Sequence, residues 1–346
     1  MPELGTAKAE AAARLLELIF IQRISQAIHV AAALGIADLI ADEPKSAEQL
    51  GKATGVQAAS LRRVMRTLAG FGVFAQDGPD RFALTPVGEF LKTGVVGSLR
   101  PAALFFGGEE AAQTEGLLLH CVKTGETAYE KQYGKSDALF DRFQKDPVAA
   151  ELFNATMSAF STLHLTGVLD AYDFSVINKL IDVGGGHGRN IAEILKRHPK
   201  MRGVLFDMPH AFEGGQQTIA QAGLGERCEV VSGDFFKSVP SGADGYMLSR
   251  VIHDWDDATS IAILKVVRKA IAPNGRLILL ETMLRGPGQR SLYPLLSDLN
   301  MMLRTGGCER TEDEYRGIYR AAGFELTRTV ETISPTGATV VEGRPV

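Results

Sequence analysis

The N-terminal part of the chain has the hydrophobic pattern of a buried helix. From Glu10 to about Leu39, apolar residues recur at helical spacings and cover more than one face of the predicted helix. A helix that is apolar nearly all round must be buried, and a second copy of the chain could supply the burying surface. We therefore expect a homodimer.

The next segment has the order helix, turn, helix, hairpin. Ser46 and Gln49 have the spacing of a capping box at a helix start, and a second helix is predicted from Ala58 to near Gly70. Two short apolar runs within residues 73–84 then flank a turn. This order is that of a winged helix, and we expect an all-helical, winged-helix-like domain.

A winged helix raises the question of DNA binding. Arg62, Arg63 and Arg66 on its second helix are available for phosphates. Three arginines on an exposed helix face are usually only a solvated surface, and one fold serves many functions. The net charge of −4 gives no overall attraction to a polyanion. We expect no nucleic-acid partner and no anionic membrane partner.

The C-terminal half has a different pattern, in which short apolar runs alternate with helical stretches. The runs lie at residues 180–183, 203–206, 229–231, 246–248, 277–280, 324–329 and 338–341. This alternation predicts a Rossmann-like α/β domain with a parallel, doubly wound sheet whose edge the last two of the seven strands complete. We expect three parts: the N-terminal domain at 1–98, a helical linker at 99–176, and the sheet domain at 177–346.

Composition adds the class of protein. Hydrophobic residues make up 45% of the 346 residues and charged residues 23%, as in ordinary globular proteins. Cys121, Cys228 and Cys308 are scattered and lack the paired spacing of a zinc site, so they read as reduced thiols. The N-terminus lacks the layout of a secretory signal, and polar residues interrupt the apolar stretch from Leu15 to Ile40. We expect a cytoplasmic location.

The strongest local motif is the glycine-rich turn Asp182-Val183-Gly184-Gly185-Gly186-His187-Gly188. Gly184, Gly186 and Gly188 let the backbone turn sharply and approach a ligand, while the next helix presents free N–H groups. A dinucleotide fingerprint is broken because Arg189 stands at its third glycine position, and no Gly-Lys-Ser/Thr follows for a phosphate loop. The spacing favours a nucleoside without pyrophosphate.

Acidic residues follow the next two strands. Asp207 ends the second strand, where its carboxylate can accept hydrogen bonds from both hydroxyls of a ribose. Asp234 and Phe235 follow the third strand and offer an acceptor for an exocyclic amine beside an aromatic face for a purine. A nucleoside site at this sheet edge is therefore predicted.

These motifs carry a family resemblance that extends over nearly the whole chain. The chain resembles the plant-type small-molecule O-methyltransferases, which include the caffeic acid and hydroxyindole enzymes. The resemblance rests on Asp182 to Gly188, Phe206-Asp207-Met208-Pro209-His210, Gly233-Asp234-Phe235-Phe236, His253-Asp254-Trp255-Asp256-Asp257, Glu281, and Gly306-Gly307-Cys308-Glu309-Arg310-Thr311.

The resemblance implies S-adenosylmethionine as methyl donor and a winged-helix-like dimerisation domain ahead of the sheet domain. Ser249 stands where plant members often carry Lys, near the adenosine or the amino-acid tail of the donor. The residues expected to bind the donor are Asp182, Gly184, Gly186, Asp207, Met208, Asp234, Phe235 and Ser249.

His253 is the candidate general base. A phenol with a pKa near 10 is only about one part in a thousand ionised at pH 7, so a base with a pKa near 6.5 would help methyl transfer. His253 follows the fourth strand, and Glu281 and Glu309 could flank its imidazole. Otherwise, Glu281 would be an exposed strand end and Glu309 would pair with Arg310 or Arg304 at the surface.

The acids around His253 also resemble a metal cluster, because catechol-type methyltransferases use magnesium. Asp256 and Asp257 are better explained as caps of the helix that begins near Ala258. We therefore expect no metal.

The acceptor pocket is expected to draw on the linker helices and on the helix before the second glycine turn. An apolar, methionine-rich lining suits a flat aromatic substrate, although the same residues at helical spacing are also ordinary core. The candidates are Phe153, Met157, Phe160, His164, Met301 and Met302.

The sequence thus predicts an enzyme that methylates a phenolic or enolic hydroxyl of a small aromatic metabolite. Two alternatives stay open. One is transfer to nitrogen or carbon on the same scaffold, and the other is a winged-helix regulator that binds a small ligand.

Overall fold

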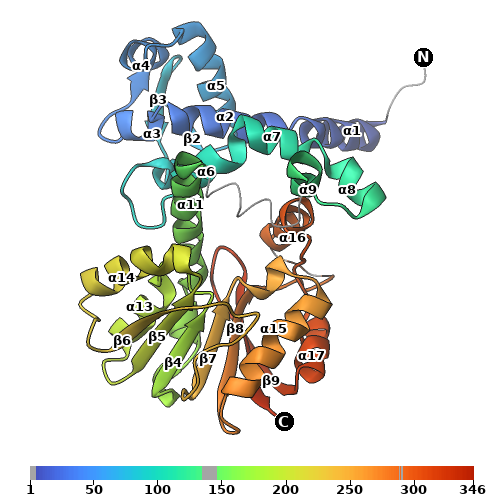
Figure 1. Cartoon of the computed structure of the whole chain (residues 1–346). Helices are drawn as coiled ribbons and strands as arrows, with labels where there is room; N and C mark the ends of the chain where they lie inside the picture. The colour runs from blue at the N-terminus through green and yellow to red at the C-terminus, as the bar shows by residue number, and fades with distance from the viewer. Residues whose placement is uncertain (1–4, 135–145, 288, 290) are drawn as a thin grey trace. The chain divides into compact units, whose positions relative to one another are not determined.

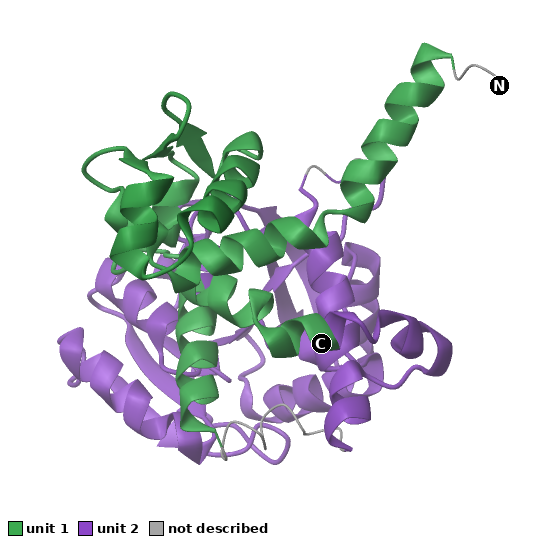
Figure 2. Cartoon of the chain, turned by 90° about the horizontal axis from the view of Figure 1, so that it is seen from above, with its two compact units in different colours: residues 1–113, 146–159 green, residues 114–145, 160–346 purple. Residues whose placement is uncertain are grey.

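The computed structural model describes residues 5–134, 146–287, 289 and 291–346. It divides into two compact units, residues 1–113 with 146–159 (unit 1) and residues 114–145 with 160–346 (unit 2), shown in Figure 2. The boundary between the units falls within helix α11 (Pro147–Leu165), after residue 159. The division at residues 98 and 176 expected from the sequence stays a prediction.

Unit 1 joins helices to a small antiparallel sheet of order β1-β3-β2. Ser46 and Gln49 form the expected capping box at the start of α4, and the predicted hairpin is β2 and β3. The elements are α1 (Thr6–Ile19), α2 (Gln22–Ala33), α3 (Ile36–Leu39), β1 (Lys45–Ser46), α4 (Ala47–Thr54), α5 (Ala58–Gly70), β2 (Phe74–Gln76), β3 (Arg81–Leu84), η1 (Gly88–Leu91) and α6 (Arg100–Gly107).

The expected continuous helix over residues 10–39 is wrong in detail, because this stretch forms three helices. Gly35 adopts a left-handed conformation with φ of 63° between α2 and α3, and it ends the helical hydrogen bonding there. The expected winged-helix domain is likewise not entirely helical, since its wing is the β2–β3 hairpin.

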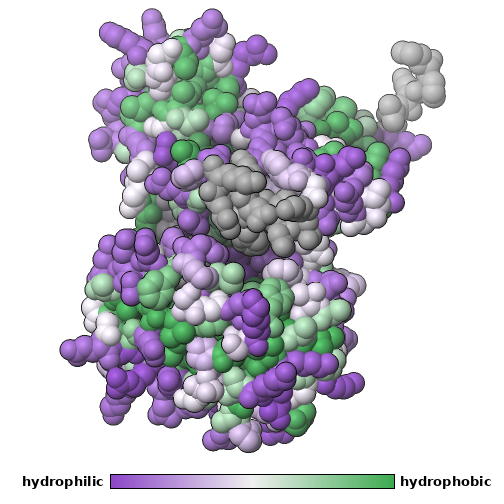
Figure 3. All heavy atoms as spheres, viewed as in Figure 1, coloured by the Kyte–Doolittle hydropathy of each residue, from purple (hydrophilic) through white to green (hydrophobic). Residues whose placement is uncertain are grey.

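Helix α1 differs from the other long helices of unit 1 because none of its residues is buried. Its large apolar side chains are exposed, Leu15 by 59% and Ile19 by 62%, and hydrophobic residues are visible along this helix in Figure 3. The apolar face that the sequence predicts to be buried is therefore uncovered in a single copy.

The described residues contain no single helix long and apolar enough to cross a membrane. Helices α1 and α2 pass the length and composition criteria only as a pair, bent by 45°.

Unit 2 contains the predicted seven-stranded sheet, of order β6-β5-β4-β7-β8-β10-β9. Strands β4 to β8 are parallel, and β10 and β9 add an antiparallel edge (Figure 1). The strands are β4 (Lys179–Val183), β5 (Arg202–Asp207), β6 (Cys228–Ser232), β7 (Gly245–Ser249), β8 (Arg276–Thr282), β9 (Phe324–Glu331) and β10 (Ala338–Pro345).

Helices of unit 2 cover both faces of the sheet. The helical elements are α8 (Leu118–Thr124), α9 (Ala128–Tyr133), α12 (Val168–Ala171), η2 (Phe174–Val176), α13 (Arg189–Arg197), η3 (Pro209–Ala211), α14 (Phe212–Gln221), η4 (Ile252–Asp254), α15 (Asp257–Ala270), α16 (Tyr293–Arg304) and α17 (Glu312–Ala321). Helix α7 (Glu109–Glu115) contributes residues to both units.

The two faces of the sheet have separate cores because successive strand residues point to opposite sides. In β8, Leu277 and Leu279 pack on the α15 and α17 side, while Ile278 and Leu280 pack on the α12 and α13 side. All four are fully buried, as expected for parallel strands covered on both faces. The same alternation places Glu281 on the α15 and α17 side.

The carboxyl ends of the parallel strands share one edge of the sheet. The glycine turn follows β4, Asp207 ends β5, η4 with His253 follows β7, and Glu281 lies near the end of β8. The predicted cofactor and catalytic residues therefore belong to neighbouring strand ends.

A second glycine turn, which precedes Glu309, lies against η4. A side chain at Gly307 would clash with the carbonyl oxygen of His253 and the backbone of Asp254. Only glycine lets these two backbone segments approach so closely.

We expect Gly307→Ala to lower the free energy of unfolding by about 1–3 kcal/mol, because the added methyl must push the backbone of η4 away. Thermal unfolding measures the change. Gly317→Ala is the matched control, since Gly317 is exposed within α17 and a Cβ there meets nothing within 4 Å. The control should be neutral or stabilising. A Gly307→Ala protein that melts with the wild type would contradict this account.

Candidate active site

The first glycine turn follows β4 and leads into α13. Gly184, Gly186 and Gly188 have φ values of 69°, 56° and 78°, so all three occupy the left-handed region that favours glycine. A Cβ on Gly184 would lie 2.9 Å from Val251 Cγ2, whereas a Cβ on Gly186 would meet nothing within 4 Å. The turn is therefore closely packed at Gly184 and leaves open space at Gly186.

Asp207 links the end of β5 to this turn. Its carboxylate accepts hydrogen bonds from the backbone N–H of Gly186 at 2.7 Å and of Met208 at 2.6 Å. A carboxylate has about four lone-pair positions, so two remain for further donors. The partly exposed Asp207 side chain is therefore held by the turn with acceptor capacity left for a ligand.

Asp234 and Phe235 follow β6. The carboxylate of Asp234 accepts the N–H of Phe236 at 2.9 Å and lies 3.0 Å from Lys237 Nζ. The hydrogen bond from Phe236, helped by Lys237, lowers the pKa of Asp234, so the group is an ionised acceptor at neutral pH. Phe235 is partly buried against the sheet core.

The remaining predicted cofactor residues lie around the same strand ends. Asp182 is fully buried, and a Cβ on Gly185 would come within 2.7 Å of its carboxylate. Burial and the charge of Asp207 raise the pKa of Asp182 to about 7. Met208 is 40% exposed, and Ser249 lies at the end of β7. Asp182 thus packs under the turn, while Met208 faces solvent.

These residues suit a nucleoside-type cofactor. Open space at Gly186 admits a ligand to the backbone, Asp207 can accept from ribose hydroxyls, and Asp234 can accept from an exocyclic amine. The N-terminus of α13 at Arg189 follows directly and favours a carboxylate or another negative group. The two acceptor carboxylates and the helix N-terminus therefore match the sugar, the base and the charged tail of a nucleoside-type cofactor.

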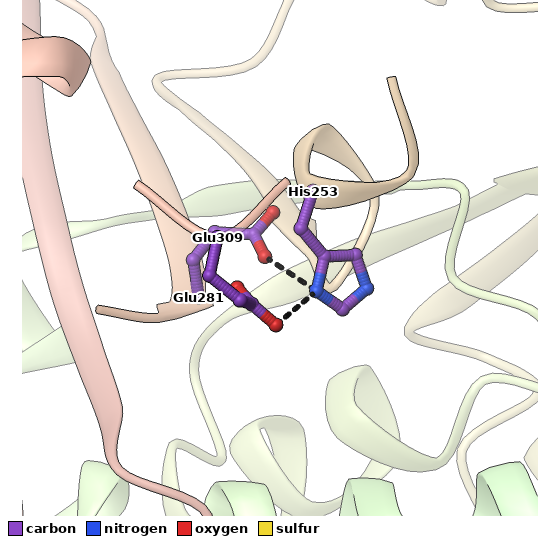
Figure 4. Close-up of side chains that lie close together, drawn as sticks. All are labelled: His253, Glu281 and Glu309. Carbon is purple, nitrogen blue, oxygen red and sulfur yellow. Dashed lines mark hydrogen bonds and ion pairs between the residues drawn. The ribbon is translucent and has the colours of Figure 1, made fainter. Parts of the chain in front are cut away.

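Beside this edge, His253 and two glutamates form a buried cluster (Figure 4). Nδ1 of His253 lies 3.0 Å from Glu309 Oε1 and 3.7 Å from Glu281 Oε2. His253 is 3% exposed, and the side chains of both glutamates are fully buried. The alternatives of an exposed Glu281 and a surface pair for Glu309 are therefore wrong.

Each carboxylate has a further hydrogen-bond donor. Glu281 Oε1 accepts the backbone N–H of Ile252 at 2.9 Å and of Val251 at 3.2 Å. Glu309 Oε1 accepts the hydroxyl of Ser297 at 2.6 Å. These donors hold the two acids in place beside the imidazole.

The protonation of the cluster follows from its burial and its charges. Burial lowers the pKa of His253, but the carboxylates of Glu309, Glu281 and Asp254 outweigh it and raise the pKa to about 9. Burial raises the pKa of Glu281 to about 7, although the charge of His253 opposes the rise. The imidazole is thus a stronger base than an ordinary histidine.

The cluster could also hold a metal ion by geometry, because one ligand atom from each of its three residues lies within 4.8 Å of the others. The hydrogen bonds from Val251, Ile252 and Ser297 already use lone pairs of both carboxylates.

Asp256 is the N-cap of α15, where it accepts the N–H of Thr259 at 2.8 Å, as the sequence predicts.

Arg310 was not recognised from the sequence, yet it holds η4 in position. Its buried guanidinium donates to the carbonyl oxygens of Ile252 and Trp255, at 3.1 and 2.7 Å, and to Asp257 at 2.9 Å. The position of Arg310 directly after Glu309 was the available signal. This arginine fixes the turn that carries His253.

The predicted acceptor residues fall in both units. Phe153 and Met157 belong to the unit 1 part of α11. In unit 2, the ring of Phe160 lies 6.4 Å from that of Tyr293.

The other three acceptor candidates of unit 2 have core contacts. His164 is buried, with Nδ1 2.9 Å from the Thr336 hydroxyl. Met301 is buried, and Met302 packs on a small cluster that includes Cys121.

Family models match both the C-terminal and the N-terminal part of the chain. Residues 117–325 match the O-methyltransferase domain, and residues 16–94 match the O-methyltransferase dimerisation domain.

Curated relatives span nearly the same length. The phenazine O-methyltransferase PhzM of Lysobacter antibioticus is 42% identical over 96% of this chain and 96% of its own. The mitomycin biosynthesis 6-O-methyltransferase of Streptomyces lavendulae is 34% identical over 91% and 88%. The 8-amino-8-demethylriboflavin N,N-dimethyltransferase of Streptomyces davaonensis is 32% identical over 91% of both chains. The relatives thus include methylation of oxygen and of nitrogen.

Solved structures have the same fold. LaPhzM has a TM-score of 0.87 and 41% identity, over 97% of this chain and 99% of its own. NcsB1 from neocarzinostatin biosynthesis, solved with S-adenosylmethionine and 2-hydroxy-5-methyl naphthoic acid, has a TM-score of 0.76 and 31% identity, over 93% and 96%. The chain belongs to the O-methyltransferase family with an N-terminal dimerisation domain, and it is an S-adenosylmethionine-dependent methyltransferase.

Proposed function

We propose that this enzyme methylates a hydroxyl group of a small aromatic acceptor, with His253 as general base and without a metal ion. The observation that carries the proposal is the buried imidazole of His253 with its Nδ1 beside two buried carboxylates, at the sheet edge where ligands of open α/β folds bind. When bound, the cofactor supplies an electrophilic methyl group.

The residues of the cluster divide the proton chemistry between them. Glu309 beside Nδ1 favours the tautomer with its proton on that nitrogen, which leaves Nε2 to accept the proton of the acceptor hydroxyl. Glu309 and Glu281 then stabilise the imidazolium that forms. The buried surroundings exclude water that would compete for the methyl group.

The raised pKa of His253 matches this chemistry. A phenol has a pKa near 10, so proton transfer to a base with a pKa of about 9 is uphill by about one unit rather than by more than three. The same shift leaves only about 1% of the imidazole neutral at pH 7. The raised pKa therefore makes the imidazole of His253 a stronger base and, below pH 9, lowers the fraction of it that is neutral.

The aromatic nature of the acceptor is supported by the side chains and by the relatives. Phe160 and Tyr293 form an edge-to-face pair in unit 2, and such rings suit a flat ligand. NcsB1 was solved with a naphthoic acid. Phe160, His164, Met301 and Met302 of unit 2 remain proposed acceptor residues, with Met302 and His164 also serving the core. Phe153 and Met157 of unit 1 stay predictions from the sequence.

Transfer to nitrogen is the second candidate, because one relative is an N,N-dimethyltransferase. An amine with a free lone pair needs no strong base for attack, whereas a neutral phenol does. The dependence of turnover on His253 separates the two.

We expect His253→Gln to lower kcat by about two to four orders of magnitude, because the acceptor hydroxyl loses its base. Isothermal titration should give a cofactor Kd within about twofold of the wild type. His198→Gln, at the end of α13, is the matched control and should keep full activity. Full activity of the His253 variant on a phenol would contradict the base assignment, and loss of cofactor binding would reassign the residue.

The same assay tests the metal-free assignment. Treatment with a chelator followed by gel filtration should leave kcat unchanged. A loss that Mg²⁺ restores would show that the cluster binds a metal ion instead.

We expect kcat/KM to rise about tenfold per pH unit from pH 7 and to level off near pH 9, because the neutral imidazole accumulates as pH approaches the pKa of His253. Removing a carboxylate lowers that pKa, so Glu309→Gln should move the rise to lower pH. A pH–rate profile with matched buffers measures both. A wild-type rise centred near pH 6.5 would contradict the influence of the glutamates.

We also propose that the enzyme is a homodimer in which a partner covers the exposed apolar face of α1. Light scattering at tens of micromolar should give twice the mass of one chain, and Leu15→Glu with Ile19→Glu should weaken the dimer at least about tenfold. Lys8→Glu on the same helix is the matched control. A monomeric wild type, or a double variant that dimerises normally, would contradict the proposal.

A further inference from the structure

Three buried polar atoms around the His253 cluster have no hydrogen-bond partner among the described residues. They are Glu281 Oε2, Glu309 Oε2 and the hydroxyl of Tyr315. The other oxygen of each acid is occupied, because Glu281 Oε1 accepts two backbone N–H groups and Glu309 Oε1 accepts the hydroxyl of Ser297. Buried polar groups nearly always have a partner, so these three atoms need an explanation.

Tyr315 lies near the start of α17 and faces the sheet. It is fully buried and shares a core with Leu279 of β8, on the side to which the alternation of β8 also directs Glu281. The chain just before α17 runs beside the end of β8, where Met283 and Arg310 form a parallel bridge. Tyr315 and the two acids therefore lie between β8 and α17.

The start of α17 fixes the backbone of Tyr315. Thr311 and Glu314 form a capping box there, and the N–H of Tyr315 donates to the carbonyl oxygen of Thr311 at 3.0 Å. The phenol ring therefore extends into the core from a well-defined position.

The hydroxyl of Tyr315 keeps its proton. Burial, and then the charges of Glu281 and Glu309, raise the pKa of Tyr315 well above its ordinary value, although the charge of Arg310 opposes the rise. An ionised carboxylate only accepts hydrogen bonds. One buried donor thus faces two buried acceptors, and no direct hydrogen bond joins them.

Tyr319, one turn further along α17, provides a comparison. It is also fully buried, and burial and the charge of Glu281 raise its pKa as well. Its hydroxyl, however, donates to the carbonyl oxygen of Val341 at 2.9 Å. The unpaired hydroxyl therefore distinguishes Tyr315 from its neighbour.

A single water molecule would satisfy all three atoms. Buried waters typically make about three hydrogen bonds to polar groups that otherwise lack a partner. One oxygen of Glu281 and one of Glu309 lie within 4.8 Å of each other beside His253, so the two acids are close enough to share a small ligand (Figure 4). The water would accept the proton of Tyr315 and donate its own two protons to the two carboxylates.

We propose that Tyr315 is a positioning residue of the active site, whose hydroxyl donates through one buried water to the free oxygens of Glu281 and Glu309. The inference rests on the proposed function in so far as it takes His253 to be the base. Tyr315 acts on the imidazole only through the two acids.

Other titratable or charged groups also face the cluster. They are Asp254 on η4, His164 on α11, Tyr293 and Asp298 on α16, Arg310 before α17, and Tyr319. None of these described groups donates a hydrogen bond to either free oxygen.

The sign of the effect on His253 follows from the charges. A donor offsets part of the negative charge of a carboxylate, and so reduces how strongly that carboxylate stabilises the imidazolium. Near pH 9, where His253 loses its proton, Glu281 is ionised, because its pKa is about 7. Removing the donor should therefore raise the pKa of His253.

The experiment compares the full-length wild type with Tyr315→Phe, which keeps the ring and loses the hydroxyl. Tyr319→Phe is the matched control, and both Tyr315 forms are also made with Glu281→Gln. NMR titration of protein with isotope-labelled histidine gives the pKa of His253, whose signal the His253→Gln variant identifies. The profile of kcat/KM against pH and the melting temperature are measured alongside.

Tyr315→Phe should raise the pKa of His253 by about 0.5 to 1 unit and move the rise of kcat/KM to higher pH by the same amount. At pH 7, kcat/KM should fall about 3- to 10-fold, and at the high-pH plateau it should stay within about threefold of the wild type. Tyr319→Phe should melt at a lower temperature and leave both curves unchanged. With Glu281→Gln, the shift caused by Tyr315→Phe should be at least about twofold smaller.

An unchanged or lowered pKa of His253 in Tyr315→Phe would overturn the inference, as would an equal shift in the presence of Glu281→Gln. A crystal structure in which the Tyr315 hydroxyl bonds neither to the acids nor to a water that reaches them would also overturn it. If the pKa of His253 shifts and the profile of kcat/KM does not follow, the inference stands and the base assignment fails. The two claims can therefore fail separately.

Discussion

A histidine and two carboxylates share a volume from which water is largely excluded, and much of the surrounding structure compensates those charges. A buried carboxylate without partners would be costly, so Glu281 receives backbone N–H groups from the η4 turn and Glu309 receives the hydroxyl of Ser297. The imidazole of His253 balances both acids. The acids, the imidazole and their hydrogen-bond donors stabilise one another, and the fold thus places a strong base at the edge of the sheet.

The η4 turn is the element on which this arrangement depends. Arg310 donates to two carbonyl oxygens of the turn region, and Gly307 lets the chain before Glu309 lie directly against it. The same turn donates N–H groups to Glu281. Because Arg310, Gly307 and Glu281 all contact this turn, a small displacement of the turn would move the imidazole relative to both acids.

The residues proposed for the cofactor and those proposed for the acceptor are separated along the same sheet edge. Asp207 and Asp234 follow neighbouring strands, β5 and β6, and Gly186 leaves the backbone open to a ligand. Phe160, proposed for the acceptor, lies on the other side, where its ring contacts Tyr293 of α16. This order follows from the crossover connections of a doubly wound sheet, which bring successive strand ends to one edge while changing their neighbours.

The sequence by itself determined the seven strands, the capping box at Ser46 and the glycine turn, because strand alternation, caps and positive φ values depend on residues close together in the chain. It also proposed His253, Glu281 and Glu309 as a group. Only the tertiary structure decided that both acids are buried against Nδ1, since Glu309 is 56 residues from His253 and no local pattern encodes that distance. The left-handed conformation of Arg250, with φ of 55°, was likewise decided by its hydrogen bond to the carbonyl oxygen of Leu280 on a neighbouring strand, which a local pattern does not record.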